Sequence, residues 1–409
     1  MAHIEYGRFP AVITVPAHLV MQWRSELINW GVPEDEIGYT PRGMSIKKRI
    51  AQFEKDTAFQ LVTYNAWAND NYWPYLLWNG NQAYSFDESH RLRKGQQGKG
   101  GAWAKVSWLR AKTKSKHTQT PIWFFSGTPM VNDATDVFPL LNLANRYRYG
   151  SRQKFALDTC LTYSGKYKMG IGPVRDPEKF HRLLGQYSIR RTWKDIPELA
   201  KLQRRDVQMP LELSRSDLMR HRAIKQDYRD PVTHEPLYSS AAMIHALRRL
   251  TVIPKVDAFC GLLEDHPDRW LALCWYRDSA NELFQRVKKS GRPCGYVDGG
   301  TSESERRRAL STYNDRPNGV LVGTLGALET GLNLQAGQNI AFIEQHYLSA
   351  TNDQAVGRLF RRGQQGPVLV YWLHCLKTFD MRVKSVAEKR AEDIDRALDG
   401  FLGDEDWSA

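Results

Sequence analysis

A short apolar run over residues 83–86 ends in two adjacent carboxylates, Asp87 and Glu88, and this pair restricts the fold more than any other feature. Carboxylates at the carboxyl end of a parallel strand face the crevice in which ligands of open α/β sheets bind. There Asp87 would hold Mg²⁺ through the water shell of the ion, and Glu88 would orient and deprotonate an attacking water molecule. The alternative is an ordinary surface turn, which these residue types also form.

The chain repeats the order of apolar strand, turn and amphipathic helix on both sides of this pair. After the run 9–15, for example, Leu19, Trp23 and Leu27 recur at helical spacing until Gly31. Such alternation predicts the α/β class, with parallel sheets covered by helices. The predicted strands are residues 9–15, 59–63, 83–86 and 122–125 in the first half, and 270–276, 294–297, 320–322, 340–343 and 368–373 in the second.

These patterns predict four segments. A first α/β lobe spans residues 1–145, a helical linker or brace spans 146–255, a second α/β lobe spans 256–376, and a C-terminal helix and tail span 377–409. Two capping boxes, Ser302-x-x-Glu305 and Thr351-x-x-Gln354, predict the starts of two helices in the second lobe.

Composition restricts the partners and the compartment. The 409 residues suffice for two domains, and the formal net charge of +13 favours nucleic acid as a polyanionic partner, although a solvated basic surface is the alternative. The five cysteines form no Cys-x-x-Cys pair, so neither a zinc nor a redox site is predicted. Neither a membrane span nor a signal peptide is recognisable, and we expect a soluble intracellular protein.

A second motif, Ser126-Gly127-Thr128, follows the apolar run 122–125. Hydroxyls at the end of a buried strand can link a phosphate-sensing histidine such as His90 to the second lobe. The alternative is a plain junction between a strand and a turn, where these residue types are common.

The most specific motif lies at residues 354–364. Arg358 and Arg361 are three residues apart and would project from one face of a helix. A planar guanidinium is suited to stabilising charge on a transferring γ-phosphate. The alternative is a basic helix face on which Gln354 is only a capping partner.

In this order the motifs resemble those of superfamily-two helicases and, among them, the Swi/Snf-type translocases of double-stranded DNA. The resemblance runs from about residue 9 to residue 389. It implies a motor of two RecA-like lobes joined by a helical linker, which binds ATP and Mg²⁺ and grips double-stranded DNA through its phosphates without reading sequence. The matching elements are residues 12–26, 62–64, 87–94, 126–132, 190–191, 299–302, 331–334 and 354–364.

The resemblance also implies roles for single residues. Arg361 would be the arginine finger, with Arg358 beside the nucleotide, and His90 would act with Asp87 and Glu88. The residues implied in nucleotide binding or coupling are Ser126, Gly127, Thr128, Glu329, Gly331 and Gln354. The residues implied in DNA contact are Pro16, His18, Thr63, Trp275, Arg277 and Thr324.

The sequence departs from the family pattern most clearly at its start. Residues 1–86 contain no Gly-Lys pair, and the segment 95–100 follows the carboxylates and lacks Ser or Thr after Lys99. We therefore expect the first lobe to be incomplete at its N-terminus, without its first strand and Walker A phosphate loop. Smaller departures are Ser89, where alanine is commoner, and Leu328-Glu329, where many relatives have two glycines.

A missing phosphate loop has an energetic consequence. Three or four charge-assisted hydrogen bonds, each worth about 1.5 to 3 kcal/mol, would be lost, and ATP binding would weaken by roughly three decades or more. We expect a separate polypeptide, or sequence upstream of Met1 in another reading frame, to supply the strand and loop.

Two other interpretations stay open: a non-catalytic DNA-binding scaffold derived from such a motor, and a truncated product. The long insertions of eukaryotic remodellers are absent. We therefore expect a compact phage or bacterial member that acts in the cytoplasm of a bacterium or of a virus-infected host cell.

Overall fold

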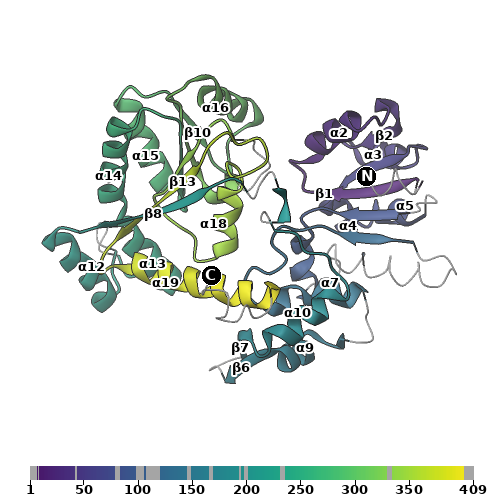
Figure 1. The fold of residues 1–409 in the computed structure, drawn as a ribbon, viewed down its shortest axis with the longest axis horizontal. Helices are drawn as coiled ribbons and strands as arrows, with labels where there is room; N and C mark the ends of the chain where they lie inside the picture. The colour runs from purple at the N-terminus through teal and green to yellow at the C-terminus, as the bar shows by residue number, and fades with distance from the viewer. Residues whose placement is uncertain are drawn as a thin grey trace. The chain divides into compact units, whose positions relative to one another are not determined.

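The structure is a computed structural model, and it describes residues 7, 9–41, 44–78, 83–97, 106, 120–144, 149–164, 169–192, 195–197, 201–230, 235–328 and 334–399. The chain divides into two compact units (Figure 1). Unit 1 comprises residues 1–188 and 393–409, and unit 2 comprises residues 189–392. The boundary falls inside the segment 146–255 that the sequence assigns to a linker.

Unit 1 is built on a parallel sheet with the strand order β2-β3-β1-β4-β5. The four strands predicted for this half are confirmed. The three-residue run of β2, Ile-Gly-Tyr, is too short to be recognised in the sequence. The strands are β1 (Ala11–Val15), β2 (Ile37–Tyr39), β3 (Phe59–Thr63), β4 (Ala83–Phe86) and β5 (Ile122–Phe124).

Both faces of this sheet are apolar, as expected for parallel strands between helices. Along β1, Val12 faces one buried cluster, while Ala11 and Ile13 face another. The elements around the sheet are α2 (Val20–Asn29), η1 (Glu34–Glu36), α3 (Ile46–Phe53), α4 (Tyr64–Ala68), α5 (Trp73–Trp78), η2 (Ser89–Gln97), η3 (Ala134–Asp136) and α7 (Phe138–Ala144).

A third cluster completes unit 1. It contains Phe138 of α7, Phe155 of α9 (Arg152–Thr159), Phe180 of α10 (Pro177–Gly185), and Ala397 near the end of α19 (Phe379–Asp399). An antiparallel pair, β6 (Cys160–Ser164) and β7 (Met169–Val174), joins α9 to α10. The end of the C-terminal helix therefore belongs to the core of unit 1.

Unit 2 is built on a parallel sheet with the strand order β10-β11-β9-β12-β13-β8. The five strands predicted for the second half are confirmed. The strands are β8 (Arg204–Leu211), β9 (Trp270–Cys274), β10 (Cys294–Val297), β11 (Val320–Thr324), β12 (Asn339–Phe342) and β13 (Val368–Cys375).

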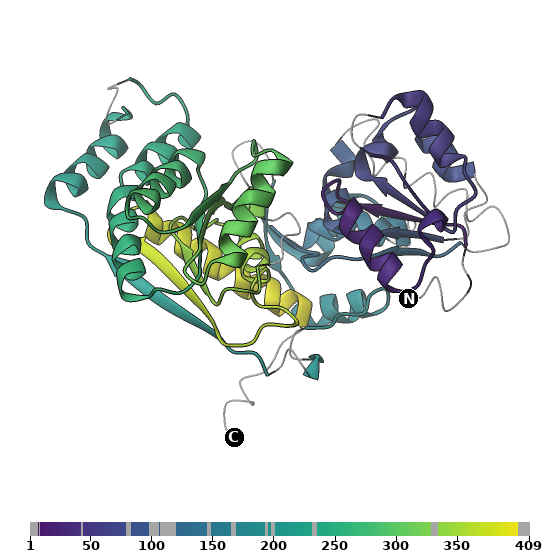
Figure 2. The same cartoon turned by 90° about the horizontal axis from the view of Figure 1, so that it is seen from above.

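Helices cover both faces of the unit 2 sheet (Figure 2). Leu271 and Leu273 of β9 pack in one cluster, and Trp270 and Ala272 pack in the other, so alternate residues of the strand fill opposite cores. The helices are α12 (Arg215–Asp227), α13 (Ser240–Arg249), α14 (Val252–Asp265), α15 (Arg277–Lys289), α16 (Glu303–Asp315), α17 (Leu325–Leu328) and α18 (Ser349–Val356).

Two sequence-based expectations need correction. The segment 146–255, expected to be helical, also contains β6, β7 and β8. Strand β8 pairs only with β13 among the described residues, and its charged residues and Pro210 conceal the apolar pattern, which is typical of an edge strand. The second correction concerns Thr351, which lies inside α18 because that helix begins two residues earlier, whereas the capping box at Ser302 and Glu305 is confirmed.

Across the part of the chain that the structure describes, the helices are too short or too polar to pass through a bilayer.

Candidate functional site

The Asp87 carboxylate lies just beyond the carboxyl end of β4, and four hydrogen bonds hold this residue. Its backbone N–H donates to the Thr14 carbonyl on β1 at 2.8 Å, and its carbonyl accepts from the Tyr64 hydroxyl at 2.6 Å. Its Oδ1 accepts from the Glu88 N–H at 2.9 Å, and its Oδ2 accepts from Trp23 Nε1 at 2.8 Å. Both the position of the backbone and the direction of the carboxylate are therefore fixed.

Glu88 adopts a left-handed backbone conformation, with φ at 52°. A residue with a Cβ rarely occupies this region, and such strain concentrates at functional sites. The turn brings Glu88 Oε2 to 3.2 Å from His90 Nδ1, and the same nitrogen lies 3.2 Å from Ser126 Oγ. His90 and Ser126 are thus in direct contact, and the link through this motif to the second lobe stays a prediction.

The Ser126 motif is anchored to the carboxylate turn through the backbone as well. The Ser89 N–H donates to the Phe125 carbonyl, and the Phe125 N–H donates to the Phe86 carbonyl, both at 2.8 Å. Ser126 Oγ also accepts from the Thr128 N–H at 3.1 Å, and Gly127 lies between these two residues. A displacement of the carboxylate turn would therefore move the loop that follows β5.

Burial dominates the pKa of Asp87. Desolvation raises the pKa of Asp87 above its usual range, and the charge of Glu88 raises it further, although the hydrogen bond from Trp23 opposes both effects. Desolvation and the neighbouring Asp87 also raise the pKa of Tyr64, which keeps its hydroxyl protonated as a donor. Two carboxylates this close favour a cation beside them.

The donor set suits Mg²⁺. Both oxygens of Asp87 accept from neutral N–H groups, and each keeps a lone pair for a metal-bound water. Among the described residues no three or more His, Cys, Asp or Glu side chains form a metal cluster. One protein carboxylate combined with water and substrate phosphates is how Mg²⁺ is commonly held, so the residues fit this ion.

Three of the residues implied in DNA contact lie at the same edge of the unit 1 sheet. Thr63 ends β3 and is paired in register with Val15 of β1, and Pro16 directly follows Val15. Pro16 is buried, and its carbonyl accepts from the Leu19 N–H, whereas His18 and Thr63 are partly exposed.

The other three lie at the carboxyl ends of the unit 2 strands. Thr324 ends β11 and is 7% exposed, while Trp275 follows β9 and packs against His346 with ring centroids 4.0 Å apart. The Arg277 side chain is 71% exposed, and its Nε donates to Asp298 Oδ2 at 2.7 Å. Of the three, Arg277 therefore offers the most accessible surface to a ligand.

Asp298 organises the loop after β10. Burial raises its pKa, but hydrogen bonds from the Gly300 N–H, Tyr296 and Arg277 outweigh burial and lower the pKa overall. The carboxylate therefore stays charged and holds the Arg277 guanidinium in place.

The arginine motif differs from its expected form. Helix α18 ends at Val356, and Arg358 and Arg361 lie in the turns that follow rather than on one helix face. Gly357 ends the helix, and tighter turns then bury Leu359 completely, so core packing decides the local conformation. Gln354 lies in the last turn of α18, and Glu329 and Gly331 lie outside the described residues.

The sequence gives Trp23 a place in a helix and in the matching element 12–26 but no role in the site, yet the structure brings it to Asp87. The order of β1 and α2 along the chain would have allowed this proximity to be predicted. Helix α2 follows β1 after a short turn, so its first turns lie near the carboxyl edge of the sheet, where Asp87 also lies.

Two parallel-sheet α/β units, one with a carboxylate pair at a strand end, match the two RecA-like lobes expected for a helicase-like protein. The family model described as SNF2-related domain matches residues 2–222, and that described as helicase conserved C-terminal domain matches residues 254–363. The chain therefore belongs to the SNF2-related family, and the expected Swi/Snf-type superfamily-two assignment is confirmed.

Curated relatives agree with this assignment. The putative ATP-dependent helicase/translocase YwqA of Bacillus subtilis is 22% identical over 94% of this chain and 43% of its own length. A Caenorhabditis elegans homologue of the SWI/SNF-related regulator of chromatin subfamily A-like protein 1 is 26% identical over 72% of this chain and 42% of its own length. The chain thus spans less than half the length of these relatives.

Among solved structures, the Sulfolobus solfataricus SWI2/SNF2 ATPase core in complex with double-stranded DNA is similar. Its alignment gives 18% identity and a TM-score of 0.38, and it covers 99% of this chain and 86% of that one.

Proposed function

We propose that the chain couples ATP hydrolysis to translocation on DNA or to remodelling of DNA. In the reaction, the oxygen of a water molecule bonds to the γ-phosphorus while the bond from phosphorus to the bridging oxygen breaks, giving ADP and phosphate. The proton of the water passes to the Glu88 carboxylate. Bound Mg²⁺ supplies charge neutralisation at the phosphates, and Asp87 would hold it.

The observation that carries this proposal is the carboxylate turn in unit 1. Asp87 is held by four hydrogen bonds, and Glu88 lies 3.2 Å from His90, which contacts Ser126. A surface turn would not require a partly buried carboxylate aimed by the Trp23 indole of α2 and a backbone carbonyl held by the Tyr64 hydroxyl of α4. His90 and Ser126 to Thr128 would transmit the state of the phosphates, while Arg358 and Arg361 would stabilise the charge on the transferred phosphoryl group.

The DNA partner is supported by the net charge of +13 and by the accessible Arg277. DNA would be bound through its phosphates, independently of sequence and as a duplex, by the six residues implied in DNA contact. The lack of long insertions supports a phage or bacterial member that acts in the cytoplasm.

The phosphate loop would come from outside these 409 residues. The two Gly-Lys pairs in the sequence, at 98–99 and 165–166, are not followed by Ser or Thr. Strand β5 supports the docking of a further strand, because within the described residues it pairs only with β4. Phe125, directly after β5, is 48% exposed.

DNA-stimulated ATP hydrolysis tests the proposal. The chain is assayed alone and after mixing with a polypeptide that carries an apolar strand, a Gly-x-x-x-x-Gly-Lys-Thr loop and a helix. We expect hydrolysis that rises on mixing and with duplex DNA, and that Glu88→Gln abolishes. A mixture that gains no activity would reject the complementing segment, and fast turnover by the chain alone would show that it is not needed.

The absence of a Gly-Lys-Ser or Gly-Lys-Thr sequence favours a second candidate, a DNA-binding scaffold without ATPase activity. In that case the chain binds duplex DNA, the Glu88→Gln variant behaves like the unaltered chain, and no added segment restores hydrolysis.

A further inference from the structure

A pocket of about 250 Å³ lies in unit 1 at the amino ends of the sheet strands. Val12 of β1 and Gln60 of β3 contribute to its walls, whereas Asp87 follows the carboxyl end of β4. Because the strands are parallel, the pocket and the carboxylate turn lie at opposite edges of the same sheet. The pocket is therefore a separate site, and its function does not depend on the ATPase proposal.

Gln60 is a buried polar residue among mostly apolar neighbours, although the buried Thr57 also lines the pocket. It is paired in register with Gly38 on one side and Val12 on the other, and Val12 is paired with Tyr84. Gln60 is only 6% exposed, and neither Nε2 nor Oε1 of its carboxamide has a hydrogen-bond partner. A buried polar group without a partner costs free energy, and such groups are rare in folded proteins.

Gly38 makes room for this carboxamide. A Cβ at residue 38 would collide with Gln60 Oε1, so a side chain there would displace the amide. Gly38 therefore leaves room for the Gln60 carboxamide. An apolar side chain at residue 60 would not carry the free-energy cost of a buried polar group without a partner.

The remaining walls describe the shape and charge of a ligand. Phe53, Tyr75, Pro10 and Leu76 supply aromatic and flat apolar surfaces. At the exposed rim, Lys55 is flanked by the carboxylates Glu54 and Asp56, so the charges are mixed and a triphosphate is disfavoured. A neutral planar ring fits this lining better than an anion.

We propose that this pocket binds a neutral, planar nitrogen heterocycle of nucleobase size through the carboxamide of Gln60. A carboxamide presents a donor and an acceptor side by side, and glutamine pairs in this way with the amino group and ring nitrogen of adenine. The aromatic and apolar walls would cover the faces of the ring, as in other small-molecule sites.

Ligand-observed NMR titrations test the proposal, with adenine as the probe and purine, which lacks the amino group, as the matched probe. Adenine that binds at a nucleotide site instead would be unaffected by Gln60→Leu, so this variant separates the two sites. Gln60→Leu removes both polar atoms, and Gln22→Leu, at an exposed position of α2, is the matched control. We expect adenine to bind at least about tenfold more tightly than purine. We also expect Gln60→Leu, but not Gln22→Leu, to remove this preference.

A thermal measurement separates loss of the site from loss of the fold. Because Gln60→Leu removes two orphaned groups, the free variant should melt about 2–4 °C higher than the unaltered chain, so lost binding cannot be assigned to unfolding. Adenine that fails to bind, or that binds the Gln60→Leu variant equally well, would overturn the proposal. So would a crystal soaked in adenine in which only ordered water contacts Gln60.

Discussion

Trp23 on α2 donates a hydrogen bond from its indole nitrogen to Asp87 Oδ2 at 2.8 Å, across 64 residues of sequence. The other oxygen of this carboxylate accepts from the Glu88 N–H. An aromatic side chain that also packs in the core therefore aims the carboxylate assigned to Mg²⁺. Trp23 thus both packs in the core and sets the direction of the Asp87 carboxylate.

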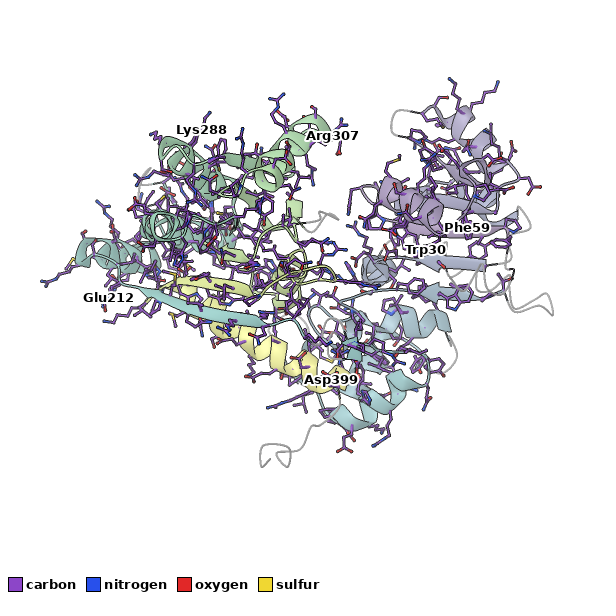
Figure 3. All side chains as sticks on the ribbon, turned by 45° about the horizontal axis from the view of Figure 1, so that its top comes forward. Trp30, Phe59, Glu212, Lys288, Arg307 and Asp399 are labelled. Carbon is purple, nitrogen blue, oxygen red and sulfur yellow. The ribbon has the colours of Figure 1, made fainter. Side chains whose placement is uncertain are left out.

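Replacing Trp23 by phenylalanine keeps the apolar ring and removes only the donor. A hydrogen bond to a charged group contributes about 1.5 to 3 kcal/mol, so we expect the Mg²⁺ concentration for half-maximal ATP hydrolysis to rise about tenfold or more. The assay is a Mg²⁺ titration of the chain supplemented with the phosphate-loop polypeptide. Trp30→Phe is the control, because Trp30 lies directly after α2 and is 45% exposed (Figure 3). Equal Mg²⁺ requirements in both variants would exclude a positioning role for Trp23.

The left-handed conformation of Glu88 predicts a conflict between stability and activity. Glycine adopts a φ of 52° without the cost of roughly 1–2 kcal/mol that a Cβ imposes, although its unfolded state is more flexible. The Glu88→Gly change also removes a charge that raises the pKa of Asp87. We therefore expect Glu88→Gly to be more stable by about 1 kcal/mol in urea unfolding and inactive in hydrolysis. Glu88→Gln is the control: it removes the charge and keeps the backbone strain, so a gain in stability equal to that of Glu88→Gly would rule out strain as the cause.

A buried ion pair in unit 2 predicts a large loss of stability. Lys255 Nζ on α14 lies 2.5 Å from Asp380 Oδ2 on α19, and the same oxygen accepts from the Cys375 N–H. Lys255→Met leaves Asp380 buried without its cation and should cost about 3–5 kcal/mol in denaturant unfolding. Lys384→Met is the control, because the Lys384–Glu388 pair on the same helix is partly exposed and should contribute at most about 1 kcal/mol.

The double variant Lys255→Met with Asp380→Leu tests the cause of that loss. If an uncompensated charge is responsible, the second change should recover most of the stability. Stability that falls further would instead indicate that the shape of the pair, rather than its charge, is required.

His374 predicts how unit 2 responds to acid. Its pKa is lowered to about 4, chiefly by burial, and its Nε2 lies 2.8 Å from Gln208 Oε1. Because the folded pKa lies below the unfolded value of about 6.5, the unfolded chain binds the proton more readily. The contribution of His374 is therefore present in full above pH 6.5 and is lost as the pH falls toward 4.

Urea unfolding between pH 7.5 and 4.5 measures this loss, and His374→Gln, which retains a hydrogen-bonding amide, should flatten the pH dependence. The pKa values of His221 and His346 are also lowered to about 4, mainly by burial, so part of the slope should remain in that variant. An unchanged slope would mean that His374 binds its proton equally readily in the folded and unfolded chains and contributes nothing.

The sequence predicted the central strands of both sheets better than two of their edge strands. Central strands such as β9 and β11 are continuous apolar runs and were recognisable, because both of their faces are buried. The edge strands β2 and β8 were missed, since one is three residues long and the other carries charged residues and a proline.

Site prediction shows the same limit. Asp87, Glu88, His90 and Ser126 could be placed because each lies at or just after a strand end, and chain order alone brings parallel strand ends together. The hydrogen bond from Trp23 to Asp87 depends on the direction that α2 takes after β1. The hydrophobic periodicity of the sequence does not determine that direction. The positions of Arg358 and Arg361 depend on where α18 ends, and the burial of Leu359 decides that end.

Arg277 is the most accessible of the three residues implied in DNA contact in unit 2, and it predicts a specific change in salt dependence. Arg277 is the first residue of α15, and its guanidinium donates to Asp298. The guanidinium is therefore oriented before any ligand binds. Removing one bond to a DNA phosphate should lower affinity equally for all duplex sequences and reduce the salt slope of binding by about 1. Fluorescence anisotropy with two unrelated duplexes over a range of salt concentrations measures both effects for Arg277→Ala.

Lys288, in the last turn of the same helix, is the matched control (Figure 3). Lys288→Ala removes the same charge at the opposite end of α15 and should leave the salt slope unchanged if binding is confined to the strand ends. Equal losses in both variants would mean that the net charge of the unit, rather than the site at the carboxyl ends of the strands, attracts DNA. A decrease in affinity for Arg277→Ala that differs between the two duplexes would contradict phosphate binding, because only bonds to the bases depend on sequence.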